Sequence, residues 1–183
     1  TDDDVLTPDA LYECVKALNE QQGISVLYSD EDKMTMDGNK FFQPHFKPDF
    51  NIDLLCTVNY ICHLFVVKRE IIEQVGMLRK EYDGAQDYDF IFRCVEYAGR
   101  QHIYHIPRVL YHWRCHEDST AENPESKRYA FEAGKNAILA HYDRIGVKAR
   151  VENGEYLGLY RTHYIREYDQ LISIIIPNKD HTD

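Results

Sequence analysis

Three polar segments of this chain carry the residue types that bind cations or move protons. They are Asp2-Asp3-Asp4, Gln86-Asp87-Tyr88-Asp89 and Tyr111-His112-Trp113-Arg114-Cys115-His116. Adjacent carboxylates repel one another, and a divalent cation is a usual reason to hold them together. Arginine can form two parallel hydrogen bonds to a diphosphate, and a neutral imidazole can bind a metal ion. Together the segments indicate a site for a metal ion and a phosphorylated ligand.

Each segment also has a plainer interpretation. The dipole of a following helix favours acidic residues before it, so Asp2-Asp3-Asp4 is also consistent with an ordinary helix start. Asp87 can simply cap the helix that it begins, and Trp113 fits a core position as well as a platform for a sugar ring. A further acidic run, Asp30-Glu31-Asp32, follows an apolar strand and imitates a metal-binding motif. For this run, a resemblance to a known family implies a structural role or a role on the side of a substrate that accepts a group.

Apolar periodicity and turn residues predict the elements that position these segments. A helix begins at Thr7-Pro8-Asp9, where Thr7 supplies a capping hydroxyl, and Gly23 ends it. Its apolar face is expected to contain Leu11, Cys14, Val15 and Leu18. The sequence also predicts strands over 24–28, 60–67, 102–106 and 109–113, and helices over 68–75, 87–98 and 124–145.

Composition limits the class of protein. A chain of 183 residues fits one domain with a substantial core. Its net charge of -10 argues against duplex nucleic acid as a partner. The five cysteines show no zinc-like spacing, which is typical of a reducing compartment. No apolar stretch is long enough to span a bilayer, so a cytoplasmic location is expected.

The chain resembles the inverting family-2 glycosyltransferases, which move a sugar from a nucleotide diphosphate to an acceptor hydroxyl. Thr1-Asp2-Asp3-Asp4, followed by Pro8-Asp9-Ala10-Leu11, is similar to that family's metal-binding motif. The spacing of Arg114, His116 and Ser119 is similar to the family's segment near the diphosphate. The resemblance implies an α/β fold of the GT-A (nucleotide-diphospho-sugar transferase) type, a Rossmann-like mixed sheet with flanking helices.

On the donor side, the resemblance implies that Asp3 and His116 hold a divalent cation, Mn²⁺ or Mg²⁺. It places Asp2 against the nucleotide ribose and Arg114, with His116, against the diphosphate. The implied donor is a nucleotide-diphosphate sugar. The cation and Arg114 offset the charge of the departing nucleotide in such a reaction.

On the acceptor side, the resemblance makes Asp87 the catalytic base, which takes the proton of an acceptor hydroxyl during in-line attack. Asp89 is expected to orient the site or the acceptor, and His63 to line the acceptor pocket. The implied acceptor is a glycan or a lipid-linked glycan of a bacterial surface polysaccharide. An enzyme with such acceptors is expected to be peripheral at the inner face of the membrane in its full length.

Two positions depart from the family pattern. Thr1 and Gln86 stand where the family often has carboxylates. Because of these changes, the alternative function is that of a non-catalytic sugar- or protein-binding module that retains the fold. A metal-dependent hydrolase with the same carboxylates is a further alternative, and it predicts release of free sugar without an acceptor.

The resemblance also predicts the domain organisation. Residues 1–166 correspond to the C-terminal part of a GT-A domain, whose nucleotide-binding strands are expected to precede Thr1. The isolated chain is therefore expected to be inactive. Residues 167–183 are expected to form a linker and the first strand of a following tandem glycosyltransferase domain. The β-branched run at 172–176 is predicted to fill the vacated sheet position in its own chain or in a strand-swapped homodimer.

Overall fold

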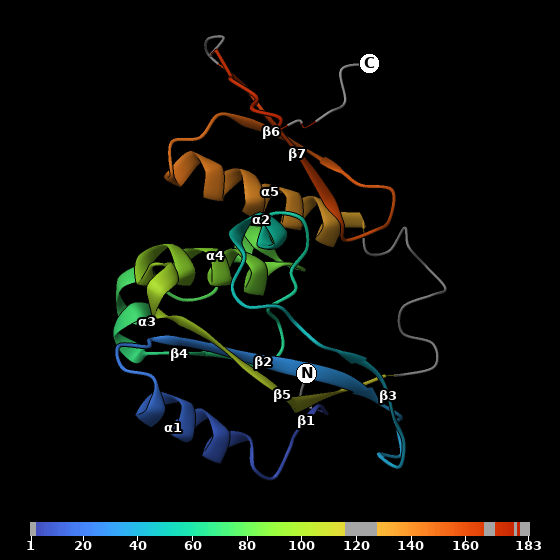
Figure 1. Ribbon diagram of the computed structural model, residues 1–183. Helices are drawn as coiled ribbons and strands as arrows, with labels where there is room; N and C mark the ends of the chain where they lie inside the picture. Colours follow the sequence, from blue (N-terminus) through green and yellow to red (C-terminus); the bar gives the residue numbers. More distant parts are fainter. Residues whose placement is uncertain (1–2, 116–127, 167–170, 178, 180–183) are drawn as a thin grey trace.

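A mixed sheet lies in the lower half of the molecule, with helices on both of its faces (Figure 1). The computed structural model describes residues 3–115, 128–166, 171–177 and 179. Helix α1 (Ala10–Glu20) lies on one face of the sheet and α4 (Gln86–Ala98) on the other. Helix α5 (Arg128–Arg144) packs on α4, and a two-stranded hairpin covers α5. The predicted mixed α/β architecture, with a mixed sheet and flanking helices, is confirmed.

The sheet has the strand order β1-β5-β2-β3, and β4 also pairs with β2. Its strands are β1 (Val5–Leu6), β2 (Val26–Met34), β3 (Phe41–His45), β4 (Phe65–Val67) and β5 (Ile103–Arg114). The long pair β2–β5 is parallel, and the other pairs are antiparallel. The separate hairpin consists of β6 (Ala149–Asn153) and β7 (Tyr160–Tyr164). The shorter helices are α2 (Ile52–Leu55), α3 (Arg69–Val75), η1 (Lys80–Tyr82) and η2 (Arg100–His102).

Strand β2 extends through the acidic run that was expected to follow it. It continues to Met34 because β5 pairs with it along its length, and Glu31 and Asp32 face Tyr111 and His112 in register. Asp30 is almost completely buried, and its Oδ1 lies 2.7 Å from Nε2 of His105. Burying an unpaired charge is costly. The side chains of β5 that pair with these carboxylates therefore allow the carboxylates to lie within the buried part of β2.

Strand β5 joins the two extended pieces that were predicted on either side of Pro107. Ser29 pairs with Ile106, whereas the next residue, Asp30, pairs with Val109. The register shift leaves Pro107 and Arg108 outside the pairing with β2. Since proline has no N–H to donate, a bulge at this position keeps the strand continuous.

Residues 59–64 form a loop rather than the first part of the predicted strand over 60–67. The ammonium group of Lys47 donates hydrogen bonds to the carbonyls of Ile61, at 3.1 Å, and His63. The backbone N–H of His63 donates to Oε2 of Glu31 at 2.7 Å. Buried backbone groups need partners, and here side chains supply them in place of a neighbouring strand.

Helix α1 packs against the sheet through small residues. Ala10, Cys14 and Ala17 are buried in a cluster with Leu27 and Leu110. The predicted apolar face is therefore wrong in part, since Leu11, Val15 and Leu18 are 72%, 57% and 42% exposed. The predicted Thr7 cap is also wrong: the helix has no side-chain cap bond, and the Thr7 carbonyl accepts from Ala10 N at 3.1 Å.

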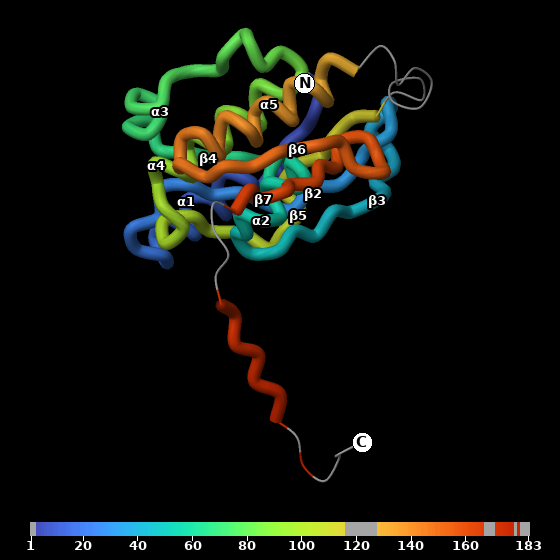
Figure 2. The backbone as a smooth tube through the Cα atoms, turned by 90° about the horizontal axis from the view of Figure 1, so that it is seen from above, coloured from blue at the N-terminus to red at the C-terminus, as the bar shows by residue number. Residues whose placement is uncertain are grey.

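The C-terminal segment extends away from the helices and the sheet (Figure 2). Residues 171–177 have no strand pairing, and Leu171, Ile174 and Ile175 are at least 80% exposed. The predicted pairing of this run within its own chain is thus not observed. Pairing with a second copy stays a prediction. Among the described residues, no helix has the length and apolar character required to cross a membrane.

Candidate functional site

The first turn of α4 carries two carboxylates on opposite faces of the helix. Asp87 is half-buried, and its Oδ2 accepts a hydrogen bond from Nδ2 of Asn59 at 3.0 Å. Asp89 is completely buried. Residues two positions apart on a helix point in nearly opposite directions, which explains why the two groups have separate environments. The two aspartates of the Asp-Tyr-Asp pattern therefore lie in different environments, one at the surface and one in the interior.

Asp89 lies among arginine side chains. Nε of Arg79 and Nε of Arg93 approach its Oδ2 at 3.0 and 2.9 Å, and Arg144 comes within 3.9 Å of Oδ1. Burial alone would raise the pKa of Asp89, but the hydrogen bonds and charges of Arg79 and Arg93 outweigh it and lower the pKa. Asp89 therefore lies inside the protein, without contact with solvent.

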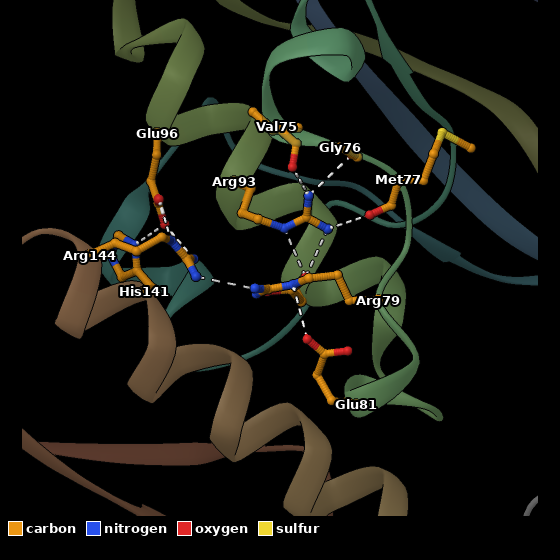
Figure 3. Close-up of polar contacts among 10 residues, drawn as sticks. Val75, Gly76, Met77, Arg79, Glu81, Arg93, Glu96, His141 and Arg144 are labelled. Atoms are coloured by element: carbon orange, nitrogen blue, oxygen red, sulfur yellow. Dashed lines mark hydrogen bonds and ion pairs between the residues drawn. The ribbon is translucent and has the colours of Figure 1, made fainter.

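The arginines around Asp89 connect three helices (Figure 3). Arg93 also donates to the carbonyls at the end of α3, those of Val75, Gly76 and Met77. Arg144 of α5 binds Glu96 of α4 through two hydrogen bonds of 2.7 Å. The network fixes the ends of α3 and α5 against α4 and so holds the helix that presents Asp87.

Glu31 anchors the loop over 59–64. Its carboxylate accepts from the His63 backbone, and Nδ1 of His45 lies 3.3 Å from its Oε1. Burial would raise the pKa of Glu31, but hydrogen bonds from His45 and His63 and the charge of Lys47 bring it down to about 2. Glu31 is therefore ionised throughout the physiological range and holds the loop as an anion.

Lys47 is the second anchor of the loop, and it is only 5% exposed. Burial lowers its pKa to about 8, although the neighbouring charge of Glu31 opposes that shift. The ammonium group lies 3.9 Å from Oε1 of Glu31. A cation at this position satisfies the loop carbonyls and offsets part of the negative charge around them.

The anchored loop connects Asp87 with strand β5. The Cys62 thiol lies against Asp87, and its pKa is raised mainly by burial and further by the charge and hydrogen bond of Asp87. The His63 ring stacks on Tyr111 with their centroids 4.7 Å apart. Tyr111 in turn donates to Oδ2 of Asp4 at 2.5 Å. His63, predicted to line an acceptor pocket, thus lies between the α4 region and the N-terminal carboxylates.

Arg114 lies beside the N-terminal acidic segment. Its backbone N–H donates to Oδ1 of Asp4 at 2.9 Å, and its Nε donates to the Asp3 carbonyl at 2.7 Å. The guanidinium also donates to the carbonyl of Met36 in the turn between β2 and β3. Asp3 and Arg114 are therefore brought together at the end of β5.

The predicted metal and ribose contacts extend beyond the described part of the chain. Asp2 and His116 lie outside the described residues. Within those residues, no group of three or more His, Cys, Asp or Glu side chains is arranged to hold a metal ion. The Asp4 carboxylate is already engaged by Tyr111 and Arg114. The predicted cation site of Asp3 and His116, and the predicted ribose contact of Asp2, therefore stay predictions.

A pocket of about 270 Å³ opens at Asp87. Its walls come from the loop after α2, the start of α4, the first turns of α5 and the β6–β7 hairpin, and they include Val58, Asn59, Asp87, Phe131, Gly158 and Tyr160. The hairpin is joined to the loop by the hydrogen bond from Tyr160 N to the Thr57 carbonyl at 2.8 Å. A larger hollow of about 580 Å³ lies over α3 and contains none of the predicted site residues.

Several residues of this region received no role from the sequence. Asn59 and Lys47 gain their importance from partners 28 and 14–16 residues away. Phe131 and Tyr160 reach the pocket through the packing of α5 and the hairpin. No local motif surrounds these residues, so only a pairing of distant segments would have revealed them.

In comparisons with known proteins, the chain is similar in sequence to parts of two longer proteins. It is 41% identical over 180 residues to the uncharacterized protein y4gI of Sinorhizobium fredii, covering 98% of this chain and 20% of that protein. It is 38% identical over 181 residues to the O-antigen biosynthesis protein RfbC of Myxococcus xanthus, covering 99% of this chain and 14% of that protein. No family model matches the chain. The chain therefore corresponds to a small part of each relative.

Proposed function

We propose that this chain is part of an enzyme of surface polysaccharide synthesis that transfers a sugar from a nucleotide-diphosphate donor to an acceptor hydroxyl with inversion. The relative RfbC is named an O-antigen biosynthesis protein, which supports an enzyme of polysaccharide synthesis. The mixed sheet with flanking helices is compatible with a GT-A domain whose nucleotide-binding strands precede Thr1. The chemistry itself rests on the residues at the pocket.

The observation that carries the proposal is the position of Asp87 at a pocket, oriented by Asn59. In the proposed step the Asp87 carboxylate takes the proton of the acceptor hydroxyl. The acceptor oxygen forms a bond to the anomeric carbon while the bond between that carbon and the diphosphate oxygen breaks. Attack opposite the departing diphosphate inverts the anomeric centre.

The donor diphosphate is proposed to lie near Arg114 and the N-terminal carboxylates. Asp3 and His116 would hold Mn²⁺ or Mg²⁺, because carboxylate and imidazole groups suit these cations, and Asp2 would face the ribose. When bound, the cation offsets the negative charge of the departing nucleotide. Arg114 keeps the Asp3 segment against the end of β5 through its bond to the Asp3 carbonyl.

The second candidate is a non-catalytic sugar- or protein-binding module with the same fold. It is favoured by Gln86, whose Oε1 accepts from the backbone N–H of Gly84 at 2.8 Å. A neutral side chain with a local structural bond thus stands where the related enzymes often have a carboxylate. The two candidates differ in whether Asp87 changes product formation.

The test compares Asp87→Asn with the parent in a transfer assay that follows nucleotide release in the presence of an acceptor. It uses the 183-residue chain and a chain extended by the segment that precedes Thr1 in its coding sequence. Transfer in the extended chain that falls by roughly a hundredfold or more in Asp87→Asn supports the enzyme. Product formation that is unchanged by Asp87→Asn supports the binding module. Release of free sugar without an acceptor would indicate a hydrolase.

A further inference from the structure

The loop over 59–64 touches two parts of the candidate site that lie far apart in the sequence. At its start, Nδ2 of Asn59 donates to Oδ2 of Asp87 at 3.0 Å. Near its end, the His63 ring stacks on Tyr111 of β5, with centroids 4.7 Å apart and ring planes 12° apart. The course of this loop therefore sets the position of both contacts at the same time.

The middle of the loop depends on a side chain for its hydrogen bonds. Sheet pairing of this part of the chain with β2 begins at Phe65, after the loop has ended. Ile61 is completely buried, and a buried carbonyl needs a donor. The ammonium group of Lys47 donates to the carbonyls of Ile61, at 3.1 Å, and His63. One side chain thus supplies the donors that a neighbouring strand would otherwise supply.

Lys47 is itself fixed to the sheet. Its side chain has no exposed surface, and its Nζ lies 3.9 Å from Oε1 of Glu31. Its backbone N–H donates to Oδ1 of Asp30 at 2.8 Å. Asp30 and Glu31 both belong to β2, so Lys47 connects the loop to an inner strand of the sheet. An apolar side chain would fill a buried position without the cost of desolvating a charge, but it could not bind the loop carbonyls.

The other anchors of the loop lie nearer to its ends. Glu31 accepts from the backbone N–H of His63 at 2.7 Å. Toward the other end, the Tyr60 hydroxyl accepts from a backbone N–H at 2.9 Å. The bond from Lys47 to Ile61 lies between these two anchors. A displacement of one end is therefore passed to the other end only when Lys47 holds the middle.

We propose that Lys47 is a positioning residue for the proposed transfer reaction. Its ammonium group holds the loop over 59–64, and the loop keeps the Asn59 amide on the Asp87 carboxylate. The same bonds keep His63 stacked on β5. The inference rests on the proposed function and adds to it a residue that acts through the loop and touches no substrate.

NMR of the 183-residue chain tests this link without requiring turnover. The side-chain amide protons of Asn59 report on the hydrogen bond to Asp87. The ring protons of His63 report on stacking, because the ring current of Tyr111 shifts them. Lys47→Met replaces the ammonium group by an apolar side chain of similar length and should move both sets of signals toward their values in the unfolded chain.

A matched lysine variant separates the loss of this contact from a general loss of charge. Lys40→Met changes an exposed lysine in the turn before β3 and should leave both sets of signals unchanged. Lys47→Gln keeps amide donors without the charge and should give a smaller change in the same signals. It carries the test when Lys47→Met does not fold.

Kinetics of the extended chain measure the effect on transfer. The donors offered are UDP-glucose, UDP-galactose, GDP-mannose and dTDP-rhamnose, with methyl glycosides as acceptors. A misplaced reacting group can slow a reaction by roughly a hundredfold, so Lys47→Met should lower kcat by roughly tenfold to a hundredfold. The KM for the donor should change less than about twofold, because Asp4 keeps its bond to the Arg114 backbone N–H.

Two further variants distinguish positioning from stability. Lys47→Arg restores a cation with several N–H donors and should recover part of the lost kcat. Ala17→Gly weakens α1, which lies on the face of the sheet opposite α4, and should lower the unfolding midpoint with little change in kcat. All rates are compared well below the unfolding midpoint of each variant.

The outcomes separate this proposal from the proposed function. A joint shift of both sets of signals, with a lower kcat that Lys47→Arg partly restores, supports the positioning role. Unchanged signals in Lys47→Met and Lys47→Gln overturn it, and so does a kcat no lower than that of Ala17→Gly. Product formation that Asp87→Asn leaves unchanged, with signals that still depend on Lys47, overturns the proposed base and leaves the link through the loop intact.

Discussion

Asp87 and Asp89 lie two residues apart on α4, and one belongs to a pocket whereas the other belongs to a buried network. Asp89 has no exposed surface and is bound by Arg79 and Arg93, whereas Asp87 lines the pocket and is held by Asn59. The helix turns one carboxylate toward the protein interior and the other toward the pocket. The buried residue fixes the helix on which the pocket residue depends.

Asp89→Asn should therefore destabilise the protein strongly. Removing one partner of a buried ion pair costs about 3 kcal/mol or more, because Arg93, only 7% exposed, is left without its counter-charge. Thermal unfolding should show a midpoint lowered by roughly 10 °C. Glu81→Gln is the control, since Glu81 is an exposed partner of Arg79 at 4.0 Å and its loss should cost less than about 1 kcal/mol. Equal midpoints for the two variants would contradict the structural role.

Glu31 should make stability depend on pH in the acid range. Its pKa falls from 4.5 to about 2 on folding. A lowered pKa in the folded state gives a stabilisation that is complete above the unfolded value and is lost as the pH falls through the folded value. Its size is on the order of 3 kcal/mol. Urea unfolding between neutral pH and about pH 2 should lose that amount in the parent relative to Glu31→Gln.

The comparison between parent and Glu31→Gln isolates this group from the other carboxylates. Glu20→Gln, an exposed substitution at the end of α1, should leave the acid dependence of the parent unchanged. If the parent and Glu31→Gln lose stability in parallel as the pH falls, then Glu31 does not anchor the loop over 59–64 as an anion.

The Cys62 thiol reports on the charge of Asp87. Burial is the main cause of its raised pKa, and the Asp87 carboxylate contributes further. Asp87→Asn removes that charge, so more thiolate should form at mildly alkaline pH. Alkylation of Cys62, followed by peptide-resolved mass spectrometry, should then accelerate.

The half-buried Cys115 at the end of β5 is the internal reference for this experiment. Its alkylation rate should be the same in the parent and in Asp87→Asn. Equal acceleration at Cys62 and Cys115 would indicate a general loosening of the protein. An unchanged rate at Cys62 would mean that Asp87 and Cys62 do not interact.

Local patterns predicted the helices better than the loops of the site. Helix α4 (Gln86–Ala98) was expected over 87–98, because its apolar periodicity ends at Gly99. The run over 60–67 was expected to be a strand because it is apolar, yet only Phe65–Val67 pairs with β2. Its first part is held by Glu31 and Lys47, and contacts of that kind leave no periodic signal in a sequence.

Packing partners also decide which apolar residues are buried. The apolar spacing of α1 is consistent with a buried face at Leu11, Val15 and Leu18, but the close approach to β5 uses the small residues Ala10 and Ala17 instead. The pocket likewise depends on how α5 and the β6–β7 hairpin meet α4. Such arrangements depend on the three-dimensional contacts of distant segments, which single-sequence patterns do not encode.

The exposed run over 171–176 should drive association of two chains. Strand β5 pairs with β2 on one side, and within the described residues β1 covers only Tyr111 and His112 on the other. A long unpaired edge can accept a strand from another chain. Light scattering should detect a concentration-dependent dimer that Ile174→Asp converts to monomer. Met77→Asp, at an exposed apolar residue near α3, should leave the dimer intact, and a monomer at all concentrations would contradict a strand-swapped dimer.

Gly134 allows the hairpin to pack on α5. A Cβ at this position would lie 2.1 Å from the Tyr160 hydroxyl, and that hydroxyl donates to the Phe131 carbonyl. Gly134→Ala should therefore cost about 1–3 kcal/mol despite the higher helix propensity of alanine. Asn136→Ala, at an exposed position on the same helix, should instead be neutral or slightly stabilising.

A second substitution tests whether the clash with the Tyr160 hydroxyl causes the loss of stability. The double variant Gly134→Ala with Tyr160→Phe removes the clashing hydroxyl and should recover part of the lost stability. Urea unfolding of the single and double variants measures the recovery. An unchanged stability in Gly134→Ala would show that the hairpin can move away from α5 at little cost.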